Sequence, residues 1–268
     1  MNKIIEPISI ILRVTLGMSF MLNGISQING ASLSHIGDFF VKFIPQAYEA
    51  IYYIGLTEFV LGLFLLFGIF TGLTAALAIV WNIALVIANP LFFINPLAAI
   101  TQMNQIAAQI GISMVVFSIG APALSFDRFF FPFKNKISVK KAYMLENSLA
   151  YSLGLTLALS FASIFLFISD QNYVIFDQWK QLGDAVPIIN MPIIGAFLAV
   201  GAVLLFLGYG RRQVAFTALI LYLLVSLSAF DKNFETLALI GATLSLSIMP
   251  SRPIKALKMI PRRKPEEL

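Results

Sequence analysis

One stretch of this chain, from Tyr48 to Gly72, is almost wholly apolar and is long enough to cross a bilayer. A helix needs about 20 apolar residues to span the hydrocarbon core, which is about 30 Å thick. Glu58 lies ten residues in from the start of the stretch, with apolar residues on both sides. An ionisable side chain at that depth costs at least about 2.5 kcal/mol and marks a functional site by default. The stretch therefore predicts a membrane helix with Glu58 as a candidate functional residue.

This stretch belongs to a series of apolar segments that runs through all 268 residues. The eight segments lie at about 7–28, 49–70, 73–94, 104–124, 147–168, 191–209, 213–230 and 235–250. Only 12% of the residues are charged, whereas soluble domains carry roughly 25%. We predict an all-α integral membrane protein with about eight transmembrane helices, surrounded by membrane lipids.

Lysine and arginine are distributed unevenly between the two predicted sides of the membrane. If the N-terminus is cytoplasmic, fourteen of these residues lie on the cytoplasmic side and three on the other. Short loops rich in Lys and Arg stay in the cytoplasm. The sequence thus predicts that both termini are cytoplasmic, in what we expect to be a prokaryotic inner membrane. The net charge of +5 then reflects topology, and no nucleic-acid partner is expected.

The chain contains an internal repeat. Ile54–Gly68 aligns without gaps with Ile194–Gly208, and Ala108–Gly111 resembles Ala238–Gly241. Four segments in each half give both halves one orientation, so we predict two parallel-repeat four-helix bundles. The predicted divisions are a first four-helix unit at 1–130, a basic cytoplasmic linker at 131–146, a degenerate second unit at 147–250 and a basic cytoplasmic tail at 251–268.

The two halves differ in their polar residues. The repeat places Leu198 opposite Glu58, Tyr222 opposite Asn82 and Ala150 opposite Arg13. Function is therefore expected in the first half. At 1.5 Å per residue, Glu58 and Asn82 come to similar depths near the membrane centre. We expect a polar pocket that opens outward, with Glu58 at its floor. Its lining would be Asn23, Asn82, Asn89 and Gln109, with Gln27, Asn104 and Gln105 at its mouth. The alternative is that these amides only bond helices together.

Two further residues are candidates for the site. Arg13 could pair with Glu58, but side chains tilt toward the N-terminus of their own helix, so the two lean apart. The alternative is that Arg13 extends toward the cytoplasm and Asp127. His35, in the first outer loop, is the single histidine of the chain and titrates near neutral pH. Glu58 itself is either a structural carboxyl or a functional one, as a proton relay or a ligand contact.

The rarest residue types exclude several kinds of chemistry. The chain has no cysteine and one histidine. Disulfides, thiolate nucleophiles, iron–sulfur clusters and cysteine metal sites are therefore excluded within this chain. A bis-histidine haem or a multi-histidine metal site is excluded in the same way, and we expect no metal and no covalently bound cofactor.

Three segments together resemble the DoxX/DoxD family, which includes the small membrane subunits of thiosulfate:quinone oxidoreductase. The segments are Ile11–Ile28, Leu56–Ile79 and Gly120–Phe129. The family pattern is an arginine before a glycine in helix one, a glutamate before a glycine-rich helix ending in G-x-x-T, and a late Ser-x-Asp. The matching residues are Arg13, Gly17, Glu58, Gly62, Gly68, Thr71, Ser125 and Asp127.

The resemblance implies a four-helix bundle and, for the sulfur-oxidising members, quinone-linked redox chemistry. In that role Glu58, Arg13 and His35 would be catalytic, whereas Asn23, Asn82, Asn89 and Gln109 would bind substrate or quinone. Thiosulfate would need cations at an outer site, where this chain offers only His35 and Lys42.

Two alternatives to an enzyme subunit stay open. One is a non-catalytic membrane subunit that packs against other subunits of a larger complex. The other is a transporter or cargo receptor, because the Surfeit-locus cargo receptors also look similar in having two such halves. Transporters usually keep polar or broken helices in both halves, so this alternative ranks last.

Overall fold

The computed structural model describes residues 2–29, 47–88, 104–120, 124–130, 139–166, 191–228 and 236–249. Helices account for nearly all of these residues, and no strand occurs among them. The helices are α1 (Asn2–Ile28), α3 (Ala47–Phe67), α4 (Thr71–Ala88), α7 (Asn104–Ile119), α8 (Asp127–Phe130), α9 (Val139–Leu166), α11 (Met191–Leu207), α12 (Arg211–Ser228) and α13 (Thr236–Ile248).

The long helices coincide with the predicted apolar segments, with one clear difference in the middle of the chain. α9 begins at Val139, eight residues before the predicted segment, so the second half of the predicted 131–146 linker is helical. Leu145 and Glu146 are buried there, which explains why this basic stretch continues the helix.

Two turns, between α3 and α4 and between α11 and α12, have the same geometry 140 residues apart. Gly68 and Gly208 both adopt a positive φ, 68° and 78°. In the first turn Gly68 N–H donates to Leu65 at 3.2 Å, and Ile69 N–H donates to Phe64 at 2.9 Å. Bonds of equal length recur at the equivalent positions of the second turn. This is the Schellman ending of a helix, in which glycine supplies the left-handed residue.

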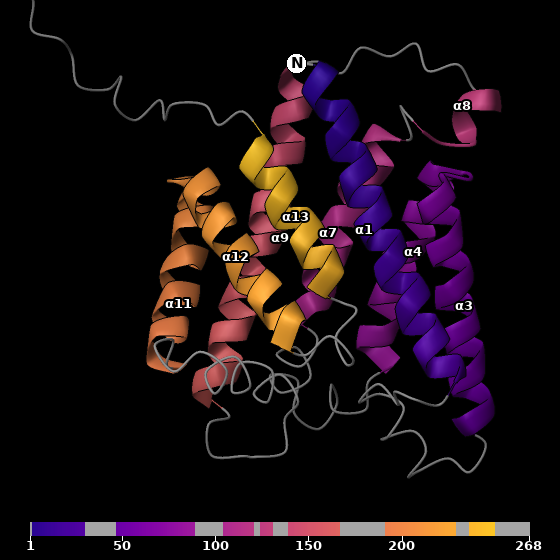
Figure 1. Cartoon of the computed structure of the whole chain (residues 1–268), viewed down its shortest axis with the longest axis horizontal. Coiled ribbons are helices and arrows are strands. Elements are labelled where there is room, and N and C mark those ends of the chain that lie inside the picture. The colour runs from indigo at the N-terminus through magenta and orange to yellow at the C-terminus, as the bar shows by residue number, and fades with distance from the viewer. Residues whose placement is uncertain are drawn as a thin grey trace, which may run out of the picture.

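The two halves interlock through their first and last helices (Figure 1). α1 packs on α3, and α9 packs on α11. α7 then packs against α9, and α13 packs against α1. A Cβ atom on Gly111 would overlap Ser152 of α9, and one on Gly241 would overlap Thr15 of α1. The fourth long helix of each half is thus held by the first helix of the other half; that the second half is a degenerate copy stays a prediction.

The outer faces of the bundle are apolar. On α4, Leu73, Leu77, Val80 and Ile87 are exposed at helical spacing, and α12 exposes Phe216, Ile220, Leu223 and Leu227 in the same way. Soluble monomers rarely expose continuous apolar patches of this extent. By length and composition, Ile5–Ile28 is long enough to cross a membrane, and several shorter apolar helices accompany it in the described part of the chain. These faces belong to a membrane protein, whereas the number of crossings stays a prediction.

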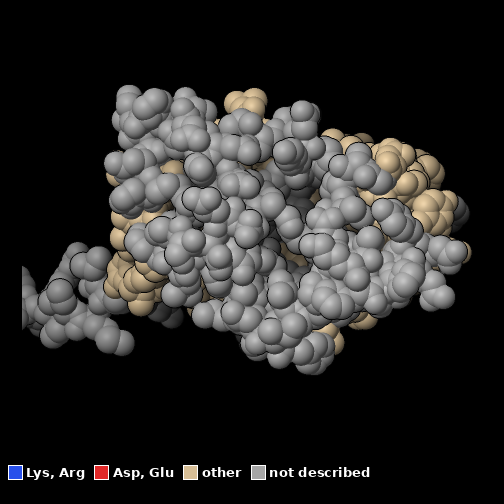
Figure 2. Space-filling model, turned by 90° about the horizontal axis from the view of Figure 1, so that it is seen from below, with Lys and Arg blue, Asp and Glu red and all other residues tan. Residues whose placement is uncertain are grey.

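Several charged side chains of the described residues lie at one end of the bundle. α1 begins, α13 ends and α8 lies at this end (Figure 1). It carries Asp127 and Arg128 of α8 and Arg211 and Arg212 at the start of α12. Figure 2 views the opposite end, where the described residues in sight carry no charge. The first and the last described helices therefore have their outer ends together at this end. That this end faces the cytoplasm stays a prediction.

Candidate functional site

The candidate site is built on a direct backbone contact between α1 and α3. Four glycines, two seven residues apart on each helix, face one another. A Cβ atom on Gly24 would lie 2.5 Å from the Phe59 nitrogen, one on Gly55 2.9 Å from the Gly24 oxygen, and one on Gly62 2.7 Å from the Gly17 oxygen. Small residues let membrane helices approach closely and pack by van der Waals contact. The contact brings the side chains beside Gly24 and Gly55 into hydrogen-bonding range.

Glu58 lies beside this contact and is only 2% exposed. Its Oε2 accepts a hydrogen bond from Asn23 Nδ2 at 2.6 Å and one from Gln27 Nε2 at 3.2 Å. Its Oε1 accepts a bond from Trp81 Nε1 at 3.3 Å. The carboxyl of α3 is thus held by two residues one turn apart on α1 and by one residue of α4. We call Asn23, Gln27, Glu58 and Trp81 the Glu58 cluster.

Trp81 was not among the residues expected from the sequence. Successive residues on a helix point about 100° apart, so Trp81 and its neighbour Asn82 cannot both face Glu58 directly. Asn82 is buried, and neither its amide nitrogen nor its amide oxygen has a hydrogen-bond partner among the described residues. The indole N–H can only donate, which makes it a definite donor to the carboxyl. In the sequence, Trp81 could have been found only through its place next to Asn82, the predicted neighbour of Glu58.

The remaining predicted pocket residues divide into two groups. Gln109 of α7 is buried, and its Nε2 lies 3.5 Å from Ser19 Oγ, one turn of α1 before Asn23. Gln27 joins the Glu58 cluster, with its Oε1 left without a partner. His35 and Asn89, and the side chains of Asn104 and Gln105, lie outside the described residues. The structure therefore brings Asn23, Gln27 and Glu58 together and leaves the mouth of the expected pocket untested.

Arg13 does not pair with Glu58. Its guanidinium donates from Nη2 to the carbonyl oxygen of Leu124 at 2.5 Å and lies against Gly68. Gly68 is ten residues beyond Glu58, or about 15 Å further along α3. Of the two alternatives for Arg13, the geometry favours the one in which its side chain extends toward Asp127. The carboxylate of Asp127 attracts the Arg13 guanidinium. Arg13 leans toward the N-terminal end of α1, as expected for a helical side chain.

Asp127 of the late Ser-x-Asp pattern holds the start of α4. Its two carboxylate oxygens accept the N–H groups of Phe70 and Thr71, each at 2.6 Å. Its own N–H donates to the Gly68 oxygen at 3.1 Å. A helix N-terminus leaves N–H groups unsatisfied and favours negative charge. Asp127 is therefore a helix cap supplied from a distant part of the chain.

Asp127→Ala is expected to lower the free energy of unfolding by about 2 kcal/mol, since it removes two charge-assisted hydrogen bonds from a helix start. Asp127→Asn retains one acceptor oxygen and should lose about half as much. Thermal unfolding in mild detergent measures the difference, and hydrogen exchange at the Phe70 and Thr71 amides locates it. Equal stability of the alanine variant and the wild-type protein would contradict this capping role.

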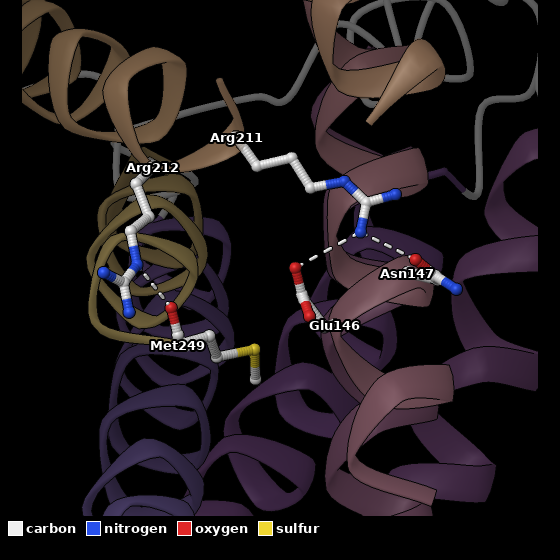
Figure 3. Close-up of polar contacts among 5 residues, drawn as sticks. All are labelled: Glu146, Asn147, Arg211, Arg212 and Met249. Carbon is white, nitrogen blue, oxygen red and sulfur yellow. Dashed lines mark hydrogen bonds and ion pairs between the residues drawn. The ribbon is translucent and has the colours of Figure 1, made fainter. Parts of the chain in front are cut away.

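The second half carries its charges differently. Arg211, at the start of α12, contacts Glu146 at 3.3 Å and Asn147 at 2.7 Å, both on α9 (Figure 3). The neighbouring Arg212 donates to the Met249 oxygen at 2.7 Å, where α13 ends. Leu198, opposite Glu58 in the repeat, is completely buried. These contacts tie helix ends together, and no carboxyl site comparable to Glu58 occurs in the described residues of this half.

The described residues contain no group of acidic or histidine side chains that could hold a metal ion. The Glu58 cluster instead offers one carboxyl, three hydrogen-bond donors and the unpartnered Oε1 of Gln27. Such a set can hold or release one proton and can bind a small polar group.

Part of the chain matches a known protein family. Residues 8–95 match the model of the DoxX family. No curated protein and no solved structure matches the chain. The matched segment contains most of α1 and all of α3 and α4, and with them all four residues of the Glu58 cluster. This part of the chain is therefore similar to the DoxX family.

Proposed function

We propose that the chain is a membrane redox subunit in which Glu58 exchanges a proton with a quinone. The observation that carries the proposal is the setting of Glu58, a buried carboxyl held by amide and indole donors from two other helices. Its distance from Arg13 adds to this argument. A carboxyl held by neutral donors can gain or lose a proton without breaking an ion pair with that arginine.

The cluster also limits how far the site can rearrange. Asn23 and Gln27 flank Gly24, whose backbone touches that of α3. Because the two backbones are already in contact, the helices cannot move closer together, which supports a site whose donors keep their places when Glu58 changes its charge. Fixed dipoles of this kind stabilise a charge at little reorganisation cost.

One buried atom of the cluster supports a quinone as the ligand. The unpartnered Gln27 Oε1 could accept a hydrogen bond from a quinol hydroxyl. A bound quinone would supply electron transfer coupled to proton uptake. Glu58 would hold the exchanged proton, while Trp81 and Asn23 would orient its carboxyl. Arg13 lies at the other end of the α1–α3 contact, so this proposal assigns it no catalytic role, and His35 keeps its proposed role in proton exchange.

Binding of quinone can be measured with the tryptophan of the site itself. The chain has two tryptophans, so Trp179→Phe leaves Trp81 as the single indole. In this background, titration with decylubiquinone or menadione should quench Trp81 fluorescence saturably. Glu58→Gln should weaken the binding by about tenfold, which corresponds to roughly 1.4 kcal/mol for one hydrogen bond to a charged group.

Thr57→Val is the matched control, because Thr57 is on α3 and its hydroxyl bonds only to Tyr53 of the same helix in the contacts seen. It should leave the quenching unchanged. The proposal fails if quenching does not saturate, or if Glu58→Gln and Thr57→Val titrate alike.

A non-catalytic subunit of a larger complex is the second candidate. The observation in its favour is that three donors already occupy the Glu58 carboxyl, as in a structural link between helices. In that case Glu58→Gln would change stability without any effect on quinone, and gentle solubilisation would yield a stable partner. The same titration therefore separates the two candidates.

A further inference from the structure

A groove of about 630 Å³ lies where α3 ends and the segment 124–129 crosses it. Its walls are mainly aromatic and aliphatic, with one cation and one hydroxyl; they comprise Leu66, Phe67, Leu124, Ser125, Phe126, Arg128 and Phe129. The Phe126 ring contacts those of Phe67 and Phe129, with centroids 6.3 Å apart in each case. The groove is therefore an ordered apolar surface with a positive charge on it.

Arg128 gives the groove a net positive charge. The acidic residue next to it, Asp127, uses both carboxylate oxygens to cap α4. Arg13 lies directly behind the wall, where it donates to Leu124 and lies against Gly68. Two arginines thus face one carboxylate that is already engaged. A bound group with one negative charge would balance them.

The position of the groove indicates that a lipid binds in it. It opens at the charged end of α3, beside the apolar outer faces that face the membrane. Phe126 is 50% exposed and Phe129 is 85% exposed, so both rings present apolar surface, as phenylalanine does on segments that lie at the boundary between head groups and acyl chains. A groove with apolar walls and a cation at this boundary matches both parts of a phospholipid.

We infer that this groove binds an anionic phospholipid, with an acyl chain along the phenylalanines and the phosphate group at Arg128. This site is separate from the Glu58 cluster and does not depend on the proposed redox function. Its occupant would bridge α3 and the 124–129 segment, and so would stabilise the junction that Asp127 and Arg13 also hold.

Native mass spectrometry of the full chain in mild detergent tests the inference. The chain is given equal amounts of phosphatidylglycerol and phosphatidylcholine with the same acyl chains. The wild-type protein should retain phosphatidylglycerol preferentially. Arg128→Gln should reduce this preference about fivefold, which is the ratio for roughly 1 kcal/mol per basic residue at an anionic surface. Lys141→Gln removes an exposed charge outside the groove and should leave the preference unchanged.

A photoreactive benzoylphenylalanine in place of Phe129 identifies the occupant in native membranes. A phospholipid adduct is the expected result. Equal retention of the two lipids, or an equal loss of preference in Arg128→Gln and Lys141→Gln, would overturn the inference. A polypeptide adduct would overturn it as well, because the groove would then be a protein interface.

Discussion

Gly24→Ala is expected to lower the free energy of unfolding by about 3 kcal/mol or more, although it adds a single methyl group. The new Cβ atom would lie 2.5 Å from the Phe59 nitrogen and would also meet the Gly55 oxygen. Both atoms belong to the backbone of α3, so no side chain can turn away to make room. The helices would have to separate, and Asn23 and Gln27 would then move away from Glu58.

Gly72→Ala is the matched control for this change. Nothing lies within 4 Å of a Cβ atom at Gly72, so alanine there should be neutral or stabilising by up to about 1 kcal/mol through helix propensity. Thermal unfolding in mild detergent compares the two variants. If both alanine variants are as stable as the wild-type protein, the α1–α3 backbone contact is not as close as the structure shows.

Glu58→Leu is expected to cost about 3 kcal/mol, because it leaves the donors of Asn23, Gln27 and Trp81 without an acceptor. A buried donor without a partner costs roughly 1–3 kcal/mol. The leucine has nearly the volume of glutamate, so the loss measures hydrogen bonding more than packing. The Trp81 fluorescence of the Trp179→Phe background should also change, because the indole N–H loses its partner.

Glu58→Gln separates the hydrogen bonds from the charge. Glutamine keeps an oxygen acceptor and should cost less than half as much as leucine. Unfolding midpoints of the three proteins, measured in the same detergent, check the order wild type, glutamine, leucine. A leucine variant as stable as the wild-type protein would show that the three donors do not hold Glu58 and would also remove the basis of the proposed function.

The positions of the long helices could be predicted from the sequence because the signal is local. An apolar segment bounded by glycine, proline or charged residues becomes a helix in a membrane, since each backbone polar group must be satisfied within the segment. The same reasoning identified Glu58, because a carboxyl in such a segment is costly wherever the other helices lie. The matching turns at Gly68 and Gly208 also follow from local sequence.

The partners of the polar residues could not be predicted in this way, because they depend on how the helices are rotated and spaced. Asn82 and Trp81 are neighbours on α4, and only the packing of α4 on α3 decides which of them meets Glu58. The packing of α1 on α3 likewise decided that Gln27, which we expected at the mouth of a pocket, bonds directly to Glu58.

The sequence by itself thus determined a helical membrane protein with one costly carboxyl at the centre of its first half. Only the tertiary structure decided what surrounds that carboxyl. Four glycines set the distance between α1 and α3, and the direction of the Arg13 side chain sent it toward Gly68 and Leu124. The physical reason is that burial of a charge is a property of one segment, whereas a hydrogen bond requires two segments at a defined distance and rotation.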